Sequence, residues 1–235
     1  MGTSRYINAI DLTSVPKITV AGVDVTYSAH VKYLGVWIAN NLSWDLQVSH
    51  ITNKVRSTLH QLKLCRHLIP DTLKIKLVVS LIYPHIDYCC AILTDITAEL
   101  NLKLYRAMNA CMRFIFCIKI DEHISPYYTR LRWLKVDKRR EYLVACLLFN
   151  ILKYQQPDLL YRLFSIKVCS SSRSMRSAED LLSVPQCRTE LYRRSYRLSA
   201  IRLWNRLPLN LRNESSSVVF KNGLYAHLLD LNAEV

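Results

Sequence analysis

The chain has 235 residues, and its 32 Lys and Arg outnumber its 18 Asp and Glu, which leaves a formal net charge of +14. Half of the residues are apolar, so a sizeable core can form and wholesale disorder is excluded. This charge favours a polyanionic partner, and nucleic acid is favoured over an anionic membrane. The alternative is a basic protein with an ordinary solvated surface. No apolar run has the length of a membrane span, and four glycines disfavour an all-β fold.

Residues 17–39 are predicted to form β structure. The stretch KITVAGVDVTY has two short alternating runs around Ala21-Gly22, which indicates a hairpin. The stretch VKYLGVWIA, residues 31–39, is predicted to be a third strand. Gly35 lies inside this strand, where the missing side chain would let a ligand approach the backbone closely. These elements form a predicted β segment over residues 1–42.

A long basic helix is predicted to follow, with Ser43 as its cap. Its apolar residues recur every three or four positions, as on the buried face of a helix: Val48, Ile51, Val55, Leu59 and Leu62. Four basic residues lie off this stripe: Lys54, Arg56, Lys63 and Arg66. They form either a nucleic-acid-binding stripe or an ordinary solvated face.

Further helices are predicted up to residue 164. A helix that begins at Pro70-Asp71 would bury a face made of three leucines: Leu73, Leu77 and Leu81. Pro84 would kink or restart this helix. The next helices are predicted at three cap or proline signals: Thr97, Ser125-Pro126 and Asp137. The last of them is the most apolar and stops before Pro157, so residues 43–164 are predicted to form a helical bundle.

The composition changes near residue 165, and residues 165–235 are predicted to be a basic linker and C-terminal tail. Residues 165–213 hold ten Lys or Arg against three acids. If LYRRSYRLSAIRLWNRL forms one helix, Arg193, Arg194 and Arg197 share a face. Trp204 and the neighbouring tyrosines are predicted to anchor the core rather than to stack on bases. The fold class is therefore mainly α, with a small N-terminal β element and an extended basic C-terminal arm.

The motifs of common catalytic and metal sites are missing from the sequence. It has no GxGxxG or GxxxxGK[ST] loop, no GxSxG elbow and no CxxC pair. His60 and His67 lie seven residues apart among Leu and Cys, which favours a core or surface role over a zinc site. Asp121-Glu122 follows FIFCIKI and is predicted to lie in a loop after a helix rather than to hold catalytic metal ions. No cofactor and no metal are therefore predicted.

The eight cysteines are predicted to be reduced thiols. They lie inside apolar helical patterns, where Cys89, Cys111 and Cys146 would act as small core side chains. The stretch MGTSRYINAI has neither the charged region nor the apolar region of a signal peptide. The protein is therefore predicted to be intracellular, in the nucleus or the cytoplasm, and not secreted.

Several stretches resemble, in the same order, the reverse transcriptases of jockey-type non-LTR retrotransposons. VPKITVAGVDVTYSAHVKYLGVWIANNLSW is similar to the last part of the palm in that family, and KYLGVWI to its primer-grip strand. LIYPHIDYCCAIL, LYRAMNACMRFIF and HISPYYTRLRWLKVDKRREYLVACLLFNIL resemble its thumb and the helical region after it. SVPQCRTELYRRSYRLSAIRLWNRLPLNLR and FKNGLYAHLL resemble its C-terminal tail, so the likeness runs from about residue 3 to residue 231.

The resemblance implies a primer-grip strand, a thumb and a tail without the catalytic centre. The metal-binding aspartates of that family, in an F/Y-A-D-D-like stretch, have no counterpart here, so the chain is expected to be a C-terminal fragment that is not an enzyme. Its expected partner is RNA or an RNA–DNA hybrid, held weakly and without sequence preference. The residues expected at this contact lie on the strand, the thumb helix and the tail: Lys32, Tyr33, Leu34, Gly35, Lys54, Arg56, Lys63, Arg66, Arg193, Arg194 and Arg197.

Two alternatives stay open, a helical remnant that binds a protein partner and a relic without function. A missing palm would leave an unpaired sheet edge and apolar thumb surface, which favour aggregation. The oligomeric state is left open.

Overall fold

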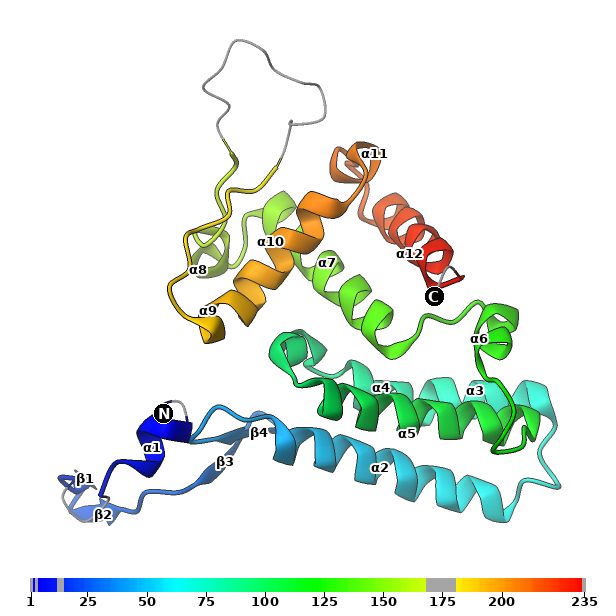
Figure 1. Cartoon of the computed structure of the whole chain (residues 1–235), viewed down its shortest axis with the longest axis horizontal. Coiled ribbons are helices and arrows are strands. Elements are labelled where there is room, and N and C mark those ends of the chain that lie inside the picture. The colour runs from blue at the N-terminus through cyan, green and yellow to red at the C-terminus, as the bar shows by residue number, and fades with distance from the viewer. Residues whose placement is uncertain (1, 3, 12–14, 168–180, 234–235) are drawn as a thin grey trace, which may run out of the picture.

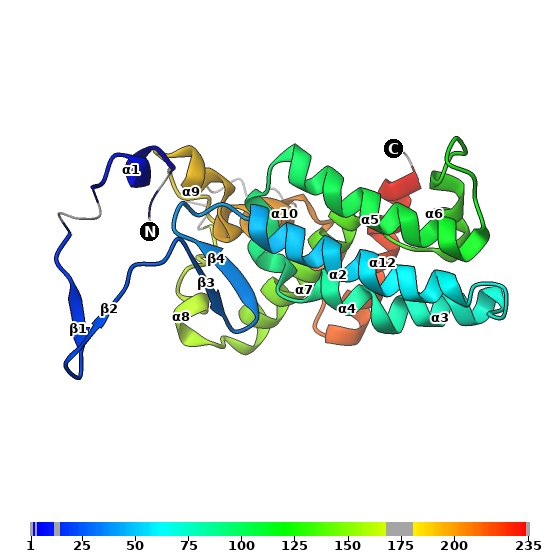
Figure 2. The same ribbon diagram turned by 90° about the horizontal axis from the view of Figure 1, so that it is seen from below.

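The computed structural model describes residues 2, 4–11, 15–167 and 181–233 (Figure 1). Helices dominate, and two small antiparallel hairpins lie near the N-terminus, which confirms the predicted mainly α fold with a small β element. A short helix, α1 (Ser4–Asn8), precedes the hairpins. Figure 2 shows the first hairpin projecting away from the helices, whereas the second lies beside the start of α2 (Asp45–Leu64).

The first hairpin forms where the sequence predicts it. β1 (Ile18–Val20) pairs with β2 (Val23–Val25), and the turn residues Ala21 and Gly22 have φ values of 50° and 80°. Two consecutive positive φ values are typical of the tight two-residue turn that matches the twist of paired strands. Every residue of β1 and β2 is exposed, so this hairpin adds nothing to the core.

The prediction of a single strand over residues 31–39 is wrong, because the chain reverses in the middle. β3 (His30–Tyr33) pairs with β4 (Val36–Ala39) through a turn at Leu34-Gly35, whose φ values are 45° and 82°. The Tyr88 hydroxyl donates a 2.6 Å hydrogen bond to the Leu34 carbonyl, and a Cβ added at Gly35 would lie 3.4 Å from the Tyr88 ring. Gly35 therefore serves a turn that Tyr88 covers. Leu-Gly lacks the Asn or Asp of the common turn signals, so the apolar alternation hides the reversal.

The first apolar cluster lies between α2 and α5 (Ala98–Phe116), and α3 and α4 pack against it. The predicted stripe of α2 is confirmed, since its first four residues are buried and Leu62 is partly buried: Val48, Ile51, Val55 and Leu59. Leu104, Met108 and Cys111 of α5 are buried in the same cluster. The basic residues of α2 are therefore left on its other sides.

The predicted caps are correct at one helix and displaced at three others. Asp137 is the second residue of α7 (Val136–Tyr154) and not its cap. The Thr97 hydroxyl accepts a 3.3 Å hydrogen bond from the backbone N–H of Leu100, and α5 begins where expected. Ser43 lies one residue before the N-cap of α2 and accepts from the N–H of Asp45 at 3.2 Å. Ser125 is the first residue of α6 (Ser125–Leu131) rather than its cap. Serine also forms local turns with the backbone two residues on, which explains the displacement at Ser43.

The predicted leucine face of α3 (Asp71–Leu81) is wrong, since Leu73 and Leu81 are each 44% exposed. The buried side of α3 instead includes Lys74. The Lys74 ammonium lies 2.9 Å from the Asp71 carboxylate and 6.0 Å from the centre of the Phe114 ring. The charge of Lys74 is thus compensated while the aliphatic part of its side chain is buried. The spacing of the leucines does not reveal this burial.

Helix α7 (Val136–Tyr154) joins the two halves of the helical body. The helical chain restarts as α4 (Tyr83–Asp87), with Pro84 in its first turn, and the 3-10 helix η1 (Cys90–Asp95) follows. The Arg139 guanidinium of α7 holds the Asp87 carboxylate in a bidentate ion pair, with N–O distances of 2.6 and 2.5 Å. The same guanidinium lies 4.1 Å from the centre of the Tyr83 ring. Both charged side chains are about three-quarters buried, so water screens this pair weakly.

The second apolar cluster lies between α7, α10 (Tyr196–Arg206) and α12 (Ser217–Ala233). Phe149 of α7 stacks on Phe220 of α12 with 4.1 Å between ring centres. Trp204 of α10 is 4% exposed, which confirms its predicted core role. The prediction of an extended C-terminal arm is wrong for the described residues 190–233, because this part of the chain is mainly helical and its helices α10 and α12 pack on α7. These helices are rich in arginine, so their overall composition does not reveal that each also has an apolar side that can be buried.

Three short helices complete the chain: α8 (Asp158–Tyr161), α9 (Glu190–Arg194) and α11 (Leu209–Arg212). Much of the predicted linker, residues 168–180, lies outside the described residues. Its flanks meet, since Ile166 and Leu182 form an antiparallel bridge.

Among the described cysteines none forms a disulfide, and Cys169 lies outside them. Cys111 and Cys146 are buried as predicted. The predicted burial of Cys89 is wrong, because Cys89 is exposed with a left-handed φ of 52° and its neighbour Cys90 is buried instead. Burial raises the pKa of Cys90 to about 11 and that of Cys111 to about 12.

Replacing Asp87 by Ala is expected to lower the free energy of unfolding by about 1.5–3 kcal/mol, because Arg139 would lose its charged partner and stay largely buried. Glu99, which pairs with Lys103 at 3.2 Å on an exposed part of α5, is the matched control. Its replacement by Ala should cost less than about 1 kcal/mol. Urea unfolding followed by circular dichroism measures both variants, and equal losses would contradict a special role for the Asp87 pair.

A thiol reagent is expected to label Cys65, Cys89 and Cys117 quickly in the folded protein and Cys90 and Cys111 slowly. Only the thiolate reacts, and burial both hides the two slow sulfurs and raises their pKa. In denaturant without reductant, all eight cysteines should react. Mass spectrometry of the labelled peptides gives the order, and a pair that stays protected in denaturant would reveal a disulfide.

Candidate nucleic-acid interface

Four basic side chains from three elements lie close together where the second hairpin meets the helices: Lys32 of β3, His50 and Lys54 of α2, and His85 of α4. We call them the basic cluster. Partial burial, and then the positive charge of Lys32, Lys54 and His85, lowers the pKa of His50. Within the described residues, no carboxylate forms an ion pair with any of the four. Lys32 and Lys54 are therefore cations without a carboxylate partner, and two imidazole rings lie beside them.

Two hydrogen bonds fix the second hairpin on the helices and so bring Lys32 beside α2. The backbone N–H of Trp37 donates to Gln47 Oε1 at 2.9 Å, and the Tyr88 hydroxyl holds the turn. Lys32 faces Trp37 across the hairpin, with its ammonium 5.9 Å from the ring centre. The position of Lys32 thus depends on residues ten and more positions away in the chain.

The hairpin tip beside the basic cluster exposes two large side chains. Tyr33 is 64% exposed and Leu34 is 74% exposed. Together with Lys32 and Gly35, they are the residues expected at the primer side, and the hairpin brings all four together. Tyr33 directly follows Lys32 in β3, so its exposed ring offers a stacking surface on the opposite face of the hairpin from the Lys32 ammonium.

The four basic residues predicted as one stripe on α2 do not share a face. Lys54 and Arg56 are two residues apart, which separates them by roughly 160° around the helix axis. Arg56 and Lys63, seven residues apart, lie on one side, whereas Lys54 lies on the side of His50. Arg66 follows the end of the helix. All four are exposed, but only Lys54 joins the basic cluster.

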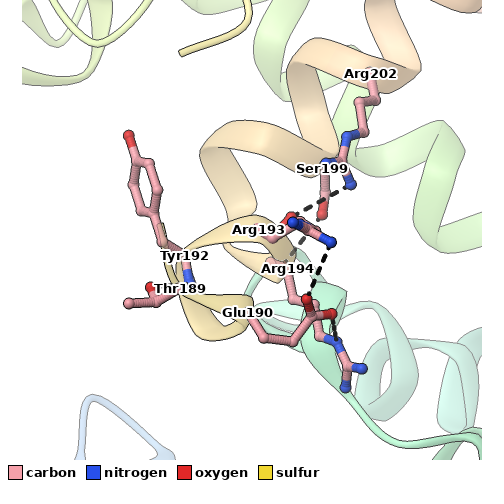
Figure 3. Close-up of polar contacts among 7 residues, drawn as sticks. All are labelled: Thr189, Glu190, Tyr192, Arg193, Arg194, Ser199 and Arg202. Carbon is pink, nitrogen blue, oxygen red and sulfur yellow. Dashed lines mark hydrogen bonds and ion pairs between the residues drawn. The ribbon is translucent and has the colours of Figure 1, made fainter. Parts of the chain in front are cut away.

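The predicted tail patch is divided between two short helices, because the chain breaks at Ser195. Figure 3 shows the Glu190 carboxylate between Arg193 and Arg194, with N–O distances of 3.5 and 2.9 Å. The Arg197 guanidinium donates a 2.9 Å hydrogen bond to the Tyr192 hydroxyl. The single helix face assumed for these arginines is wrong, and Glu190 offsets part of their charge.

The residues weighed as catalytic or metal-binding candidates from the sequence lie on the surface of the described part of the chain. Asp121 and Glu122 are exposed in the loop after α5, as predicted, and Glu122 accepts a 2.6 Å hydrogen bond from the Tyr127 hydroxyl. His60 and His67 are both exposed. Over the described residues, no three His, Cys, Asp or Glu side chains are grouped as metal ligands, and no helix is long and apolar enough to cross a membrane.

The two histidines of the basic cluster were not predicted from the sequence as binding residues. His50 lies one helical turn before Lys54, so the four-residue spacing on α2 was a usable signal. His85 comes from another helix, and its proximity to His50 is set only by the packing of α4 beside α2. No local pattern in YPHID points to that contact.

Comparisons of the chain with protein families, with curated proteins and with solved structures find no match.

Replacing Lys54 by Met is expected to raise the pKa of His50, because one of the positive charges that oppose its protonation is removed. Lys63→Met is the matched control, since Lys63 lies 13 residues after His50 on the same helix, about 20 Å away from it. Titration of the His50 ring protons by NMR measures the change. Equal shifts in both variants, or none in either, would show that Lys54 and His50 are not close.

Proposed function

We propose that this chain binds nucleic acid through the phosphate backbone, without reading base sequence, on the surface formed by the second hairpin and α2. One observation carries the proposal: Lys32, His50, Lys54 and His85 converge from three elements without a carboxylate partner among the described residues. Burial, and then the charges of Lys32, Lys54 and His85, lower the pKa of His50, so part of this shift reflects repulsion between like charges. A bound phosphate would relieve this repulsion.

The chemistry of the neighbouring residues supports a nucleic-acid ligand over a simple anion. Cations that neutralise phosphates release condensed counterions, and this term gives affinity without sequence preference. The exposed ring of Tyr33 at the hairpin tip can stack on a base or a terminal base pair. The proposed ligand is therefore RNA or an RNA–DNA hybrid, bound weakly.

We also propose that the chain derives from the C-terminal part of a jockey-type retrotransposon reverse transcriptase. The order of its motifs supports this origin, as does a hairpin carrying KYLG beside a basic helix. The sequence has no F/Y-A-D-D-like stretch, and two-metal phosphoryl transfer requires a pair of carboxylates. We therefore propose that this chain does not polymerise DNA by itself.

A protein-binding role is the second candidate, and the first hairpin favours it. Its apolar strand residues are all about half exposed or more: Ile18, Val20, Val23 and Val25. An exposed two-stranded hairpin with apolar side chains is a typical site for pairing with another chain. Salt dependence separates the two roles, because contacts with phosphates weaken steeply as salt rises and apolar contacts do not.

The purified protein is expected to bind a fluorescent RNA–DNA hybrid, and a scrambled hybrid of equal length equally well, with affinity that falls as salt rises. Replacing Lys32 and Lys54 together by Met should weaken binding to both hybrids. It should also make the slope of log K against log salt shallower by about 1.8, from about 0.9 per lost phosphate contact. Fluorescence anisotropy across a salt series measures the affinity and the slope.

Replacing Arg56 and Lys63 provides the matched control, because it removes the same amount of charge from the opposite side of α2. The double variant Arg56→Met, Lys63→Met should change affinity much less than the first double variant. If both double variants lose affinity equally, total charge and not the basic cluster accounts for binding. Affinity that is absent, or indifferent to salt, would remove the nucleic-acid proposal and favour the protein-binding role.

A further inference from the structure

A second positively charged site lies on different elements, in a pocket between η1, α7 and α10. Its volume is about 280 Å³. Three arginines line it: Arg140 of α7, and Arg202 and Arg206 of α10. Arg202 and Arg206 are four residues apart and so lie on the same side of α10. Thr94 and Ser199 add hydroxyl groups to the wall.

Two of the three guanidinium groups, those of Arg140 and Arg202, have neutral hydrogen-bond partners. Arg140 donates a 2.9 Å hydrogen bond to the side-chain oxygen of Asn101. Arg202 donates a longer one, 3.4 Å, to the backbone carbonyl of Arg193, as Figure 3 shows. Within the described residues, no carboxylate oxygen lies within 4.0 Å of a nitrogen of Arg140, Arg202 or Arg206.

The two carboxylates that also line the pocket are engaged elsewhere. Glu141 pairs with Lys138 at 3.0 Å, and Asp137 accepts a hydrogen bond from the Tyr105 hydroxyl. Arg140 is half-buried, and its burial lowers its pKa even though Asp137 and Glu141 act in the opposite direction. The lining thus holds three cations and two carboxylates, and Glu141 is already paired with Lys138, so positive charge is in excess in the pocket.

We propose that this pocket binds the terminal phosphate group of a small ligand, such as a phosphate monoester or a diphosphate. Guanidinium groups match the oxygens of a phosphate with two parallel hydrogen bonds each, and three of them suit a dianion better than a single carboxylate. The Thr94 hydroxyl can donate to a further phosphate oxygen. The small volume admits a phosphate group and excludes a duplex.

The pocket is separate from the basic cluster of the proposed nucleic-acid surface. The cluster is built on β3, α2 and α4, whereas the pocket is built on η1, α7 and α10. Removing charge from one site therefore leaves the contacts of the other intact. This separation lets one set of variants test the two sites independently.

Inorganic pyrophosphate is the probe, titrated into the purified protein by calorimetry at constant ionic strength. Saturable binding is expected, and acetate at the same concentration should not compete. Arg206 and Arg202 are both exposed, so Arg206→Met and Arg202→Met are expected to fold normally, as circular dichroism will check. Each should raise the Kd for pyrophosphate about tenfold or more, since each removes a charge-assisted pair. Arg106→Met, which removes an exposed arginine from α5, should leave the Kd unchanged.

Affinity for the RNA–DNA hybrid distinguishes a small ligand from a backbone phosphate. If the proposal is correct, Arg202→Met and Arg206→Met leave hybrid affinity within twofold of the unchanged protein at equal salt. Parallel losses of pyrophosphate and hybrid affinity would overturn it and assign the pocket to a nucleic-acid contact. The absence of saturable pyrophosphate binding, or an equal loss in Arg106→Met, would also overturn it. These results stand whether or not the basic cluster binds nucleic acid.

Discussion

The fold depends on how α7 is buried between two apolar clusters, with Arg139 bound to Asp87 where they meet. Val136 at the start of α7 belongs to the first cluster, and Phe149 further along belongs to the second. Asp87 is the last residue of α4, and α3 and α4 contribute buried residues to the first cluster. The ion pair thus links parts of the chain 52 residues apart, and its partial burial makes a broken pair costly.

The burial of α7 also decides what its basic residues can do. The run at residues 138–140 holds three consecutive cations in sequence, yet each has a different environment. Lys138 pairs with Glu141, Arg139 with Asp87, and Arg140 faces the pocket beside α10. The helix turns by about 100° per residue, so neighbours in sequence face different elements. A basic run therefore does not by itself define a basic surface.

Whether a basic residue has a carboxylate partner in the folded protein separates the strong binding candidates from the weak ones. Arg193 and Arg194 belong to the most arginine-rich part of the chain, but Glu190 is bound to both. Lys32 and Lys54 lie in stretches of ordinary composition, yet the docked hairpin gathers them with His50 and His85. Phosphate binding depends on charge that is exposed and uncompensated, which is a property of the assembled surface.

Features that depend on nearby residues were predictable from the sequence. The bounds of α5 follow from the Thr97 cap and a continuous helical pattern, and the first hairpin follows from Ala21-Gly22 between two alternating runs. The buried stripe of α2 was likewise predictable, because its period of three and four is local. Lys54 was identified as a binding candidate for the same reason, as a basic residue off the buried stripe, whereas Lys32 was identified through the resemblance of KYLGVWI to a primer-grip strand.

Features that depend on distant partners were not predictable. Lys74 is buried because Asp71 and the ring of Phe114 compensate its charge, so α3 turns Leu73 outward. The turn at Leu34-Gly35 is held by Tyr88, which lies 54 residues further along the chain. His85 joins the basic cluster through the packing of α4, and the arginines of the pocket meet through the packing of α7 on α10. The chain's amino acids specify helical periods and caps, because these need only residues within one or two turns. Which face is buried, and which charges stay uncompensated, depends on burial and electrostatic partners that only the tertiary fold brings together.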